Sequence, residues 1–122
     1  MIRLFALLWL FAGAAHAALP GELLEPEKAF RFSTRALDAN AVEVRFAIAD
    51  GYYMYRERFR FAADPGSGYK LGAPQFPPGQ KKKDEFFGEV ETYRGEVAIR
   101  IPVEGKGGAL GLTVTSQGCA DV

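Results

Sequence analysis

Apolar and polar residues alternate along most of this chain with the two-residue period of a β-strand. The alternation is clearest over residues 42–48, and it recurs over residues 97–103 and 110–115. Neighbouring side chains on a strand point to opposite faces, so each of these segments can place one face on a core. No segment after residue 17 keeps the helical period over a useful length, and the pattern therefore predicts an all-β protein.

Glycine and proline separate these segments at intervals typical of an all-β domain. Asp50-Gly51, residues 64–68 and residues 104–108 indicate turns or loops. Residues 69–79 hold three prolines and are expected to be irregular. Short strands joined by such turns predict an immunoglobulin-like β-sandwich. The tryptophan and the cysteine pair of antibody domains are missing, so the prediction concerns topology alone.

Residues 52–61 are predicted to form one strand with two unlike faces. Tyr53, Tyr55 and Phe59 would face the core, and either tyrosine could instead cover a reactive group. Met54 and the arginines would form an outer, basic face. A basic face can indicate nucleic-acid binding, but the chain balances 15 Lys and Arg against 15 Asp and Glu. We therefore interpret this face as solvated surface and expect no nucleic-acid partner.

The N-terminus has the composition of a secretory signal peptide. Arg3 precedes a run of apolar residues, and the run ends in an Ala-His-Ala cleavage motif whose last residue is Ala17. The run is shorter than the roughly 20 apolar residues that span a bilayer. We predict a cleaved signal peptide at residues 1–17 and an exported domain at residues 18–122.

The chain contains a single cysteine, Cys119, and its one histidine lies inside the predicted signal peptide. This composition excludes Ser–His and Cys–His nucleophilic pairs, an internal disulfide and the common zinc sites, so we expect no metal and no cofactor. Cys119 follows Gly118 beyond a strand pattern and is predicted to lie on a loop. An unpaired exported cysteine can be a buried core residue, a reactive thiol or the link of a covalent dimer. Asp121 would disfavour the thiolate that reactivity needs.

A second group of candidate site residues combines acidic and aromatic side chains. Asp84 and Glu85 follow three consecutive lysines, and the whole charged run is expected to be solvated surface. Phe86 and Phe87 are neighbours and cannot both be buried on one strand face, so one of them is expected on a loop or an outer surface. Adjacent carboxylates seldom face one substrate, and a glycosidase-type acid pair is therefore disfavoured.

Four sequence blocks together resemble one protein family, the N-terminal periplasmic domain of the thiol:disulfide interchange protein DsbD. They occur in the order and with the spacing of that family, and the resemblance covers roughly residues 25–122. Together the blocks are specific, whereas any one of them alone would be weak. The blocks are DGYYMYR at residues 50–56, DEFFG at 84–88, ETYR at 91–94 and TVTSQGCAD at 113–121.

The resemblance implies an immunoglobulin-like domain and an oxidoreductase function, thiol–disulfide exchange through mixed disulfides. It implies electrons received from a transmembrane domain of the same polypeptide. The electrons would pass, in the periplasm, to a C-terminal thioredoxin-like domain, disulfide isomerases and cytochrome c maturation proteins. The expected partners are thus thioredoxin-like proteins, without a small-molecule substrate.

The resemblance also assigns roles to residues. Cys119 matches the first of the family's two active-site cysteines. Phe86 matches the phenylalanine of a cap loop that shields these cysteines, and Phe87 lies beside it. Tyr53 and Tyr55 match aromatic residues next to the cysteines. The acidic residues expected near the site are Asp84, Glu85 and Asp121.

The family's second cysteine follows a few residues after the first, in a Cys-Tyr-Pro-Pro segment, and it forms the mixed disulfide. This sequence ends at Val122, before that position. We therefore expect an incomplete domain that forms one mixed disulfide through Cys119 without full turnover. The alternative is an immunoglobulin-like binding module without chemistry, which would contact proteins through exposed aromatic residues.

Overall fold

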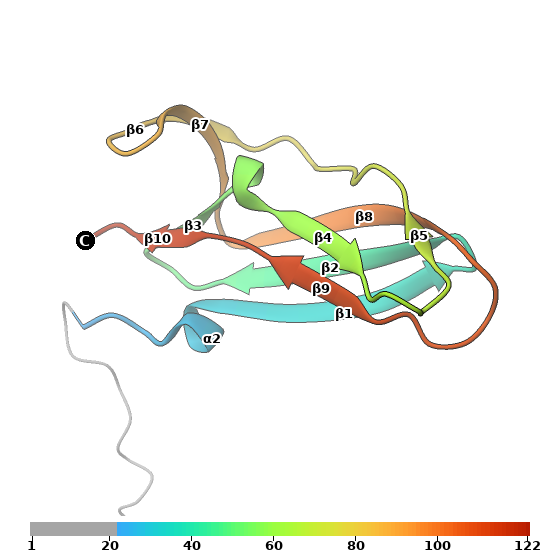
Figure 1. Ribbon diagram of the computed structural model, residues 1–122. Helices are drawn as coiled ribbons and strands as arrows, with labels where there is room; N and C mark the ends of the chain where they lie inside the picture. The colour runs from blue at the N-terminus through green and yellow to red at the C-terminus, as the bar shows by residue number, and fades with distance from the viewer. Residues whose placement is uncertain (1–21) are drawn as a thin grey trace, which may run out of the picture.

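The computed structural model describes residues 22–122, so the predicted signal peptide at residues 1–17 lies outside the described residues. The described part is built almost entirely of β-strands (Figure 1). No helix within it is long and apolar enough to cross a membrane. In chain order the elements are α2 (Pro26–Ala29), β1 (Phe30–Asp38), β2 (Ala41–Ile48), β3 (Tyr52–Tyr55), the 3-10 turn η2 (Arg56–Arg58), β4 (Arg60–Ala63), β5 (Lys70–Leu71), β6 (Gln80–Asp84), β7 (Gly88–Tyr93), β8 (Glu96–Glu104), β9 (Leu112–Thr115) and β10 (Gly118–Ala120).

The largest sheet has the order β1-β2-β8-β5 and carries most of the core. β2 and β8 pair antiparallel from Ala41 opposite Pro102 to Ala47 opposite Glu96. Alternate side chains of both strands are buried, as the two-residue period predicted. The buried residues of these strands that belong to the core cluster are Val44, Phe46, Ile48, Val97, Ile99 and Ile101.

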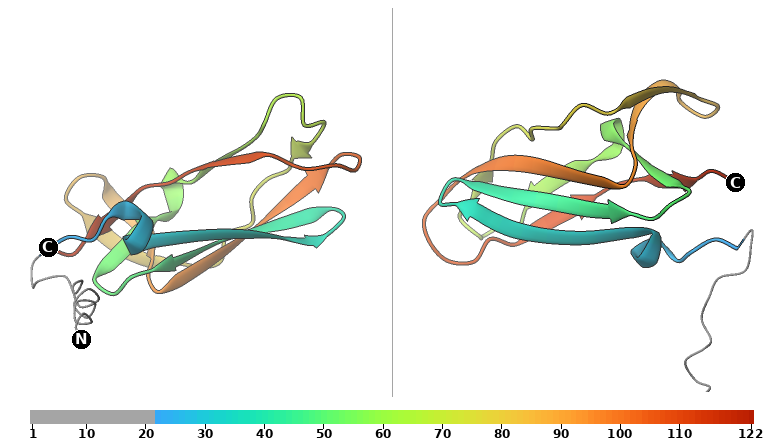
Figure 2. Two further views of the ribbon diagram at one scale, coloured as in Figure 1. Left: turned by 90° about the horizontal axis from the view of Figure 1, so that it is seen from below. Right: turned by 180° about the vertical axis from the view of Figure 1, so that it is seen from behind.

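A second layer lies over this sheet and completes a sandwich (Figure 2). β4 and β9 form a two-stranded antiparallel sheet in which Phe61 is opposite Val114. Both side chains pack against the core cluster, together with Leu112 and Phe76. Burial of apolar surface from both layers is the main stabilising contribution in such a fold. The all-β, immunoglobulin-like prediction is confirmed.

A third sheet lies at one end of the sandwich, beside the described C-terminus (Figure 1). Its order is β10-β3-β7-β6, and we call it the end sheet. β10 pairs antiparallel with β3, so that Cys119 is opposite Tyr53. β6 and β7 form a hairpin whose turn spans residues 85–87. This arrangement brings the QGCAD, DGYYMYR and DEFFG blocks into one region.

The prediction of a single strand over residues 52–61 is wrong. The 3-10 turn Arg56–Arg58 interrupts it, and β3 and β4 belong to different sheets. Met54, which was expected on an outer face, is fully buried in the core cluster. The reason is that β3 is covered on both faces, by the core on the Met54 side and by polar contacts of Tyr53 and Tyr55 on the other.

Three further local predictions need correction. Cys119 lies on the short strand β10 and not on a loop, because tertiary pairing with β3 orders it. The charge run before Glu85 forms β6, and its last residue, Asp84, is buried and not solvated. Pro26 opens the single-turn helix α2 where an extended lead-in was expected; proline is well tolerated in the first turn of a helix.

Candidate functional site

Cys119 is half-buried and faces a pocket of about 450 Å³ at the end of the molecule. Gly118 before it allows β10 to approach β3 closely, since a Cβ atom there would lie 2.8 Å from the carbonyl oxygen of Tyr53. Glycine is therefore required here for space. Six of the predicted site residues line the pocket: Tyr53, Asp84, Glu85, Phe86, Cys119 and Asp121.

Tyr55 lies behind the pocket and connects its two walls. Its hydroxyl donates a hydrogen bond to Asp84 Oδ2 at 2.6 Å and lies 3.5 Å from the hydroxyl of Tyr53. Burial raises the pKa of Tyr55 well above its ordinary value, and interactions with Asp84, Tyr53 and Cys119 act in the same direction. Tyr55 therefore keeps its proton and serves as a hydrogen-bond donor beside the thiol.

Asp84 organises the turn between β6 and β7. Its Oδ1 accepts hydrogen bonds from the backbone N–H groups of Phe86 at 2.6 Å and Phe87 at 3.0 Å. The hydrogen bond from Tyr55, followed by these two backbone bonds and the charge of Lys82, holds the pKa of Asp84 below its usual value, although burial opposes the shift. One ionised carboxylate thus ties the turn to β3.

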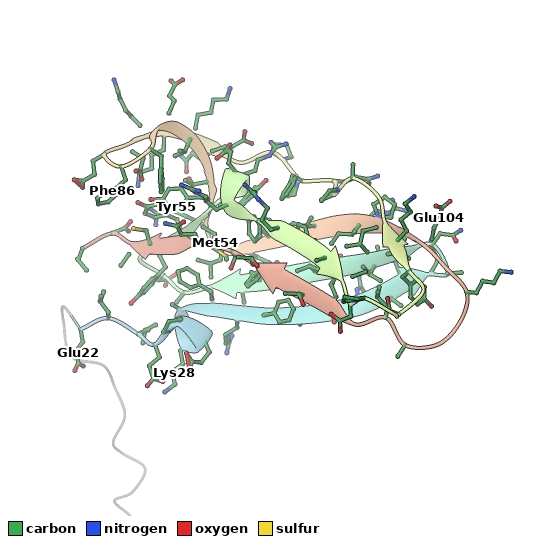
Figure 3. The ribbon with its side chains drawn as sticks, in the orientation of Figure 1. Glu22, Lys28, Met54, Tyr55, Phe86 and Glu104 are labelled. Atoms are coloured by element: carbon green, nitrogen blue, oxygen red, sulfur yellow. The ribbon has the colours of Figure 1, made fainter. Side chains whose placement is uncertain are left out.

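The two neighbouring phenylalanines of this turn have different surroundings. The ring of Phe87 meets the Tyr55 ring edge-on at 5.2 Å, and the guanidinium of Arg58 lies 4.3 Å from its centroid. Phe86 is 70% exposed and projects at the tip of the turn (Figure 3). Phe87 therefore anchors the turn, whereas Phe86 presents an apolar surface beside the pocket. Both phenylalanines lie in the turn at residues 85–87, and the expectation that one of the pair lies on a loop or an outer surface is confirmed most clearly by Phe86.

Two cations that the sequence interpretation did not assign to the site also belong to it. Lys82 Nζ lies 3.6 Å from the centroid of the Tyr53 ring, and the Arg94 guanidinium lies 5.0 Å from it. Arg94 also binds Asp121, so this carboxylate is charge-paired near the thiol. Lys82 could have been found from its two-residue spacing to Asp84, which places both on one strand face. Arg94 belongs to the ETYR block, but nothing local indicates its partner.

The chemistry available to this arrangement is that of a thiol. Cys119 lines the pocket together with the rings of Tyr53 and Phe86 and the hydrogen-bonded carboxylate of Asp84. Among residues 22–122, no group of three His, Cys, Asp or Glu side chains could hold a metal ion. A thiolate in such a site can attack a disulfide and form a mixed disulfide.

The family model described as "Thiol:disulfide interchange protein DsbD, N-terminal" matches residues 21–122. The chain belongs to this family. It is 47% identical over 98% of its length to the thiol:disulfide interchange protein DsbD of Ralstonia nicotianae and 41% identical over 99% to that of Neisseria meningitidis. In both cases it spans about a fifth of the DsbD relative.

Two solved structures of the DsbD N-terminal domain from Neisseria meningitidis have the same fold. The reduced form superposes with a TM-score of 0.73 at 41% identity, covering 85% of this chain and 82% of that one. The second is a complex with the PilB N-terminal domain, with a TM-score of 0.68 at 40% identity, covering 82% of this chain and 77% of that one. The resemblance drawn from the four sequence blocks is confirmed.

Proposed function

We propose that this chain is a periplasmic thiol–disulfide exchange domain in which Cys119, the one cysteine of residues 1–122, is the thiol that reacts within this sequence. The observation that carries the proposal is the position of the single cysteine in a pocket bordered by the Phe86 turn, in a chain of the DsbD N-terminal family. Behind the pocket, the protonated hydroxyl of Tyr55 holds the Asp84 carboxylate, which in turn holds the Phe86 turn, and this arrangement suits a partly covered thiol.

The exchange step follows from the chemistry of thiols. The Cys119 thiolate attacks one sulfur of a partner disulfide; a new bond forms to Cys119 Sγ, the partner's S–S bond breaks, and the second partner sulfur leaves as a thiolate that takes a proton. Two electrons pass to the partner only when another thiol resolves this mixed disulfide. Residues 1–122 contain one cysteine, so the resolving thiol comes from outside this sequence.

The proposed partners are thioredoxin-like periplasmic proteins, such as disulfide isomerases and cytochrome c maturation proteins. A membrane-embedded domain would supply the electrons, and a C-terminal thioredoxin-like domain would accept them. Support comes from the DsbD relative that was solved in complex with the PilB N-terminal domain. The exposed Phe86 beside the pocket gives such a partner an apolar contact next to the thiol.

The test uses a thioredoxin-like domain that keeps one reactive cysteine, held as a mixed disulfide with thionitrobenzoate. We expect the chain to release one equivalent of thionitrobenzoate and to form a covalent complex of the two proteins. The Cys119→Ser variant should do neither. The proposal fails if the chain reacts with this partner no faster than glutathione does at the same thiol concentration.

The exposure of Phe86 also favours a second candidate, a binding module without chemistry. Such a module would bind the same thioredoxin-like domain equally well with Cys119 or Ser at position 119, and it would form no mixed disulfide. Non-reducing electrophoresis of the oxidised chain alone tests the third possibility, a covalent dimer through Cys119. A monomer under those conditions excludes it.

A further inference from the structure

We propose that Arg94 is a positioning residue for Cys119. Its side chain holds β10, the strand that carries the thiol, against β3 and so sets how accessible the thiol is. The inference rests on the proposed function because it takes Cys119 as the reacting thiol. It gives a role to the ETYR block, whose last residue is Arg94.

One guanidinium contacts both β3 and the segment that follows β10. Arg94 Nη2 lies 2.7 Å from Asp121 Oδ1, and Nη1 lies 3.1 Å from Oδ2, a bidentate pair just past β10. Nη1 also lies 3.4 Å from the carbonyl oxygen of Tyr52, and the guanidinium packs on the ring of Tyr53. Arg94 itself follows the last residue of β7. Its side chain thus joins β7, β3 and the segment after β10.

β10 is the element of the end sheet that most needs such support. It has three residues, lies at the edge of the sheet and pairs with β3 alone. Backbone bonds from Tyr55 to Gln117 at 3.0 Å and from Asp121 to Gly51 at 2.8 Å close its two ends. Short edge strands open more easily than central ones. A planar fork that grips the carboxylate beside Cys119 opposes this opening.

The competing explanation is a direct effect of charge on the thiol. If Arg94 acted by favouring the Cys119 thiolate, removal of its positive charge would slow the reaction, and removal of the Asp121 negative charge would speed it. If the two side chains act as one clamp, either loss opens β10 and both changes have the same sign. The clamp therefore predicts rate changes of the same sign in the two single variants, whereas the charge effect predicts rate changes of opposite sign.

The experiment measures the alkylation rate of native Cys119 by iodoacetamide, a neutral reagent. Arg94→Gln and Asp121→Asn should each raise the rate about two- to fivefold, the range expected for a partly exposed ion pair. The double variant should react no faster than either single one. Arg35→Gln, which removes an arginine from an ion pair with Glu43 and leaves the residues that line the pocket untouched, is the control and should leave the rate unchanged.

Rate changes of opposite sign in the two single variants, or no change in Asp121→Asn, would overturn the proposal. Thermal unfolding of each variant separates local opening from loss of the fold. If Arg94→Gln folds poorly, Asp121→Asn still breaks the ion pair from its exposed carboxylate side and leaves the contacts of Arg94 with Tyr52 and Tyr53 in place. The assay involves no protein partner. The alkylation rates could change as predicted while the chain fails to react with a thioredoxin-like disulfide. That result would refute the proposed function and leave the role of Arg94 standing.

Discussion

The β2–β8 pair and the end sheet β10-β3-β7-β6 use burial in different ways. Between β2 and β8 the buried side chains are aliphatic or aromatic and have no polar atoms to satisfy. The end sheet buries Tyr53, Tyr55, Asp84 and Thr92, and each needs a partner for its polar atoms. The first region gains stability directly from apolar burial, whereas the second gains a defined geometry around a thiol.

This difference predicts that the two regions can be damaged independently. Substitutions between β2 and β8 should lower the stability of the whole sandwich without altering the chemistry of the folded state. Substitutions in the end sheet should change the reactivity of Cys119 at a smaller cost in stability. The following variants test this separation, from the largest effect to the smallest.

Ile99→Ala should lower the free energy of unfolding by about 2–5 kcal/mol, because Ile99 is fully buried and its truncation leaves a cavity in the core. Denaturant titration measures the loss. At low temperature, where the variant remains folded, iodoacetamide should alkylate Cys119 at the wild-type rate. A large change in that rate would show that the core and the site are coupled.

Tyr55→Phe should cost about 1–3 kcal/mol, because it removes the hydrogen bond to Asp84 in a buried site. It should also speed alkylation of Cys119, since the carboxylate that holds the turn loses its link to β3. Tyr93→Phe is the matched control: its hydroxyl donates to the carbonyl oxygen of Pro77 at 2.7 Å, away from the pocket. Equal alkylation rates in the two variants would contradict a special role for Tyr55.

Phe87→Ala and Phe86→Ala should separate anchoring from partner contact. Loss of Phe87 removes ring contacts with Tyr55 and Arg58 and should cost about 1 kcal/mol while loosening the turn. Loss of the exposed Phe86 should change stability by less than about 0.5 kcal/mol but slow the reaction with a thioredoxin-like disulfide. The idea fails if Phe86→Ala reacts with that partner as fast as the wild type.

The smallest expected effect is on the stability of the fold at acidic pH. The hydrogen bond from Tyr55 lowers the pKa of Asp84 below its ordinary value of 3.8, so ionised Asp84 stabilises the folded state at neutral pH. This contribution is present above pH 3.8 and is lost as the pH falls through the folded-state pKa. Asp84→Asn, which stays neutral, should flatten the fall of melting temperature below about pH 4. An unchanged slope would contradict the pairing.

The sandwich could be predicted from sequence because strand period and turn residues are local signals. Val44 and Ile99 alternate with polar neighbours, and this pattern needs no knowledge of the strand partner. The break at Arg56–Arg58 could not be found in this way, because the aromatic residues on either side of it, Tyr55 and Phe59, keep the two-residue period although Glu57 lies between them. β10 is equally hidden: Gly-Cys-Ala carries no alternation, and only pairing with β3 makes it a strand.

For the candidate site, the four blocks contain most of the residues that the structure brings together around the pocket, but they do not show how these residues are connected. Asp84 looked like the end of a solvated charge run, yet it is buried because Tyr55 and two backbone N–H groups satisfy its oxygens. Asp121 is expected from sequence to disfavour the thiolate, yet in the structure its charge is paired with Arg94. Both contacts join residues more than 25 positions apart, and strand pairing alone brings them together.

The most direct test of the account is a competition for Cys119. Equal concentrations of a thioredoxin-like domain and of glutathione, each activated with thionitrobenzoate, are offered to the reduced chain, and mass spectrometry identifies what becomes bound to the cysteine. If the cover over Cys119 favours reaction with a protein, the cysteine should form mainly the protein–protein mixed disulfide, although the smaller glutathione reagent diffuses faster. A chain found mainly glutathionylated would contradict the account.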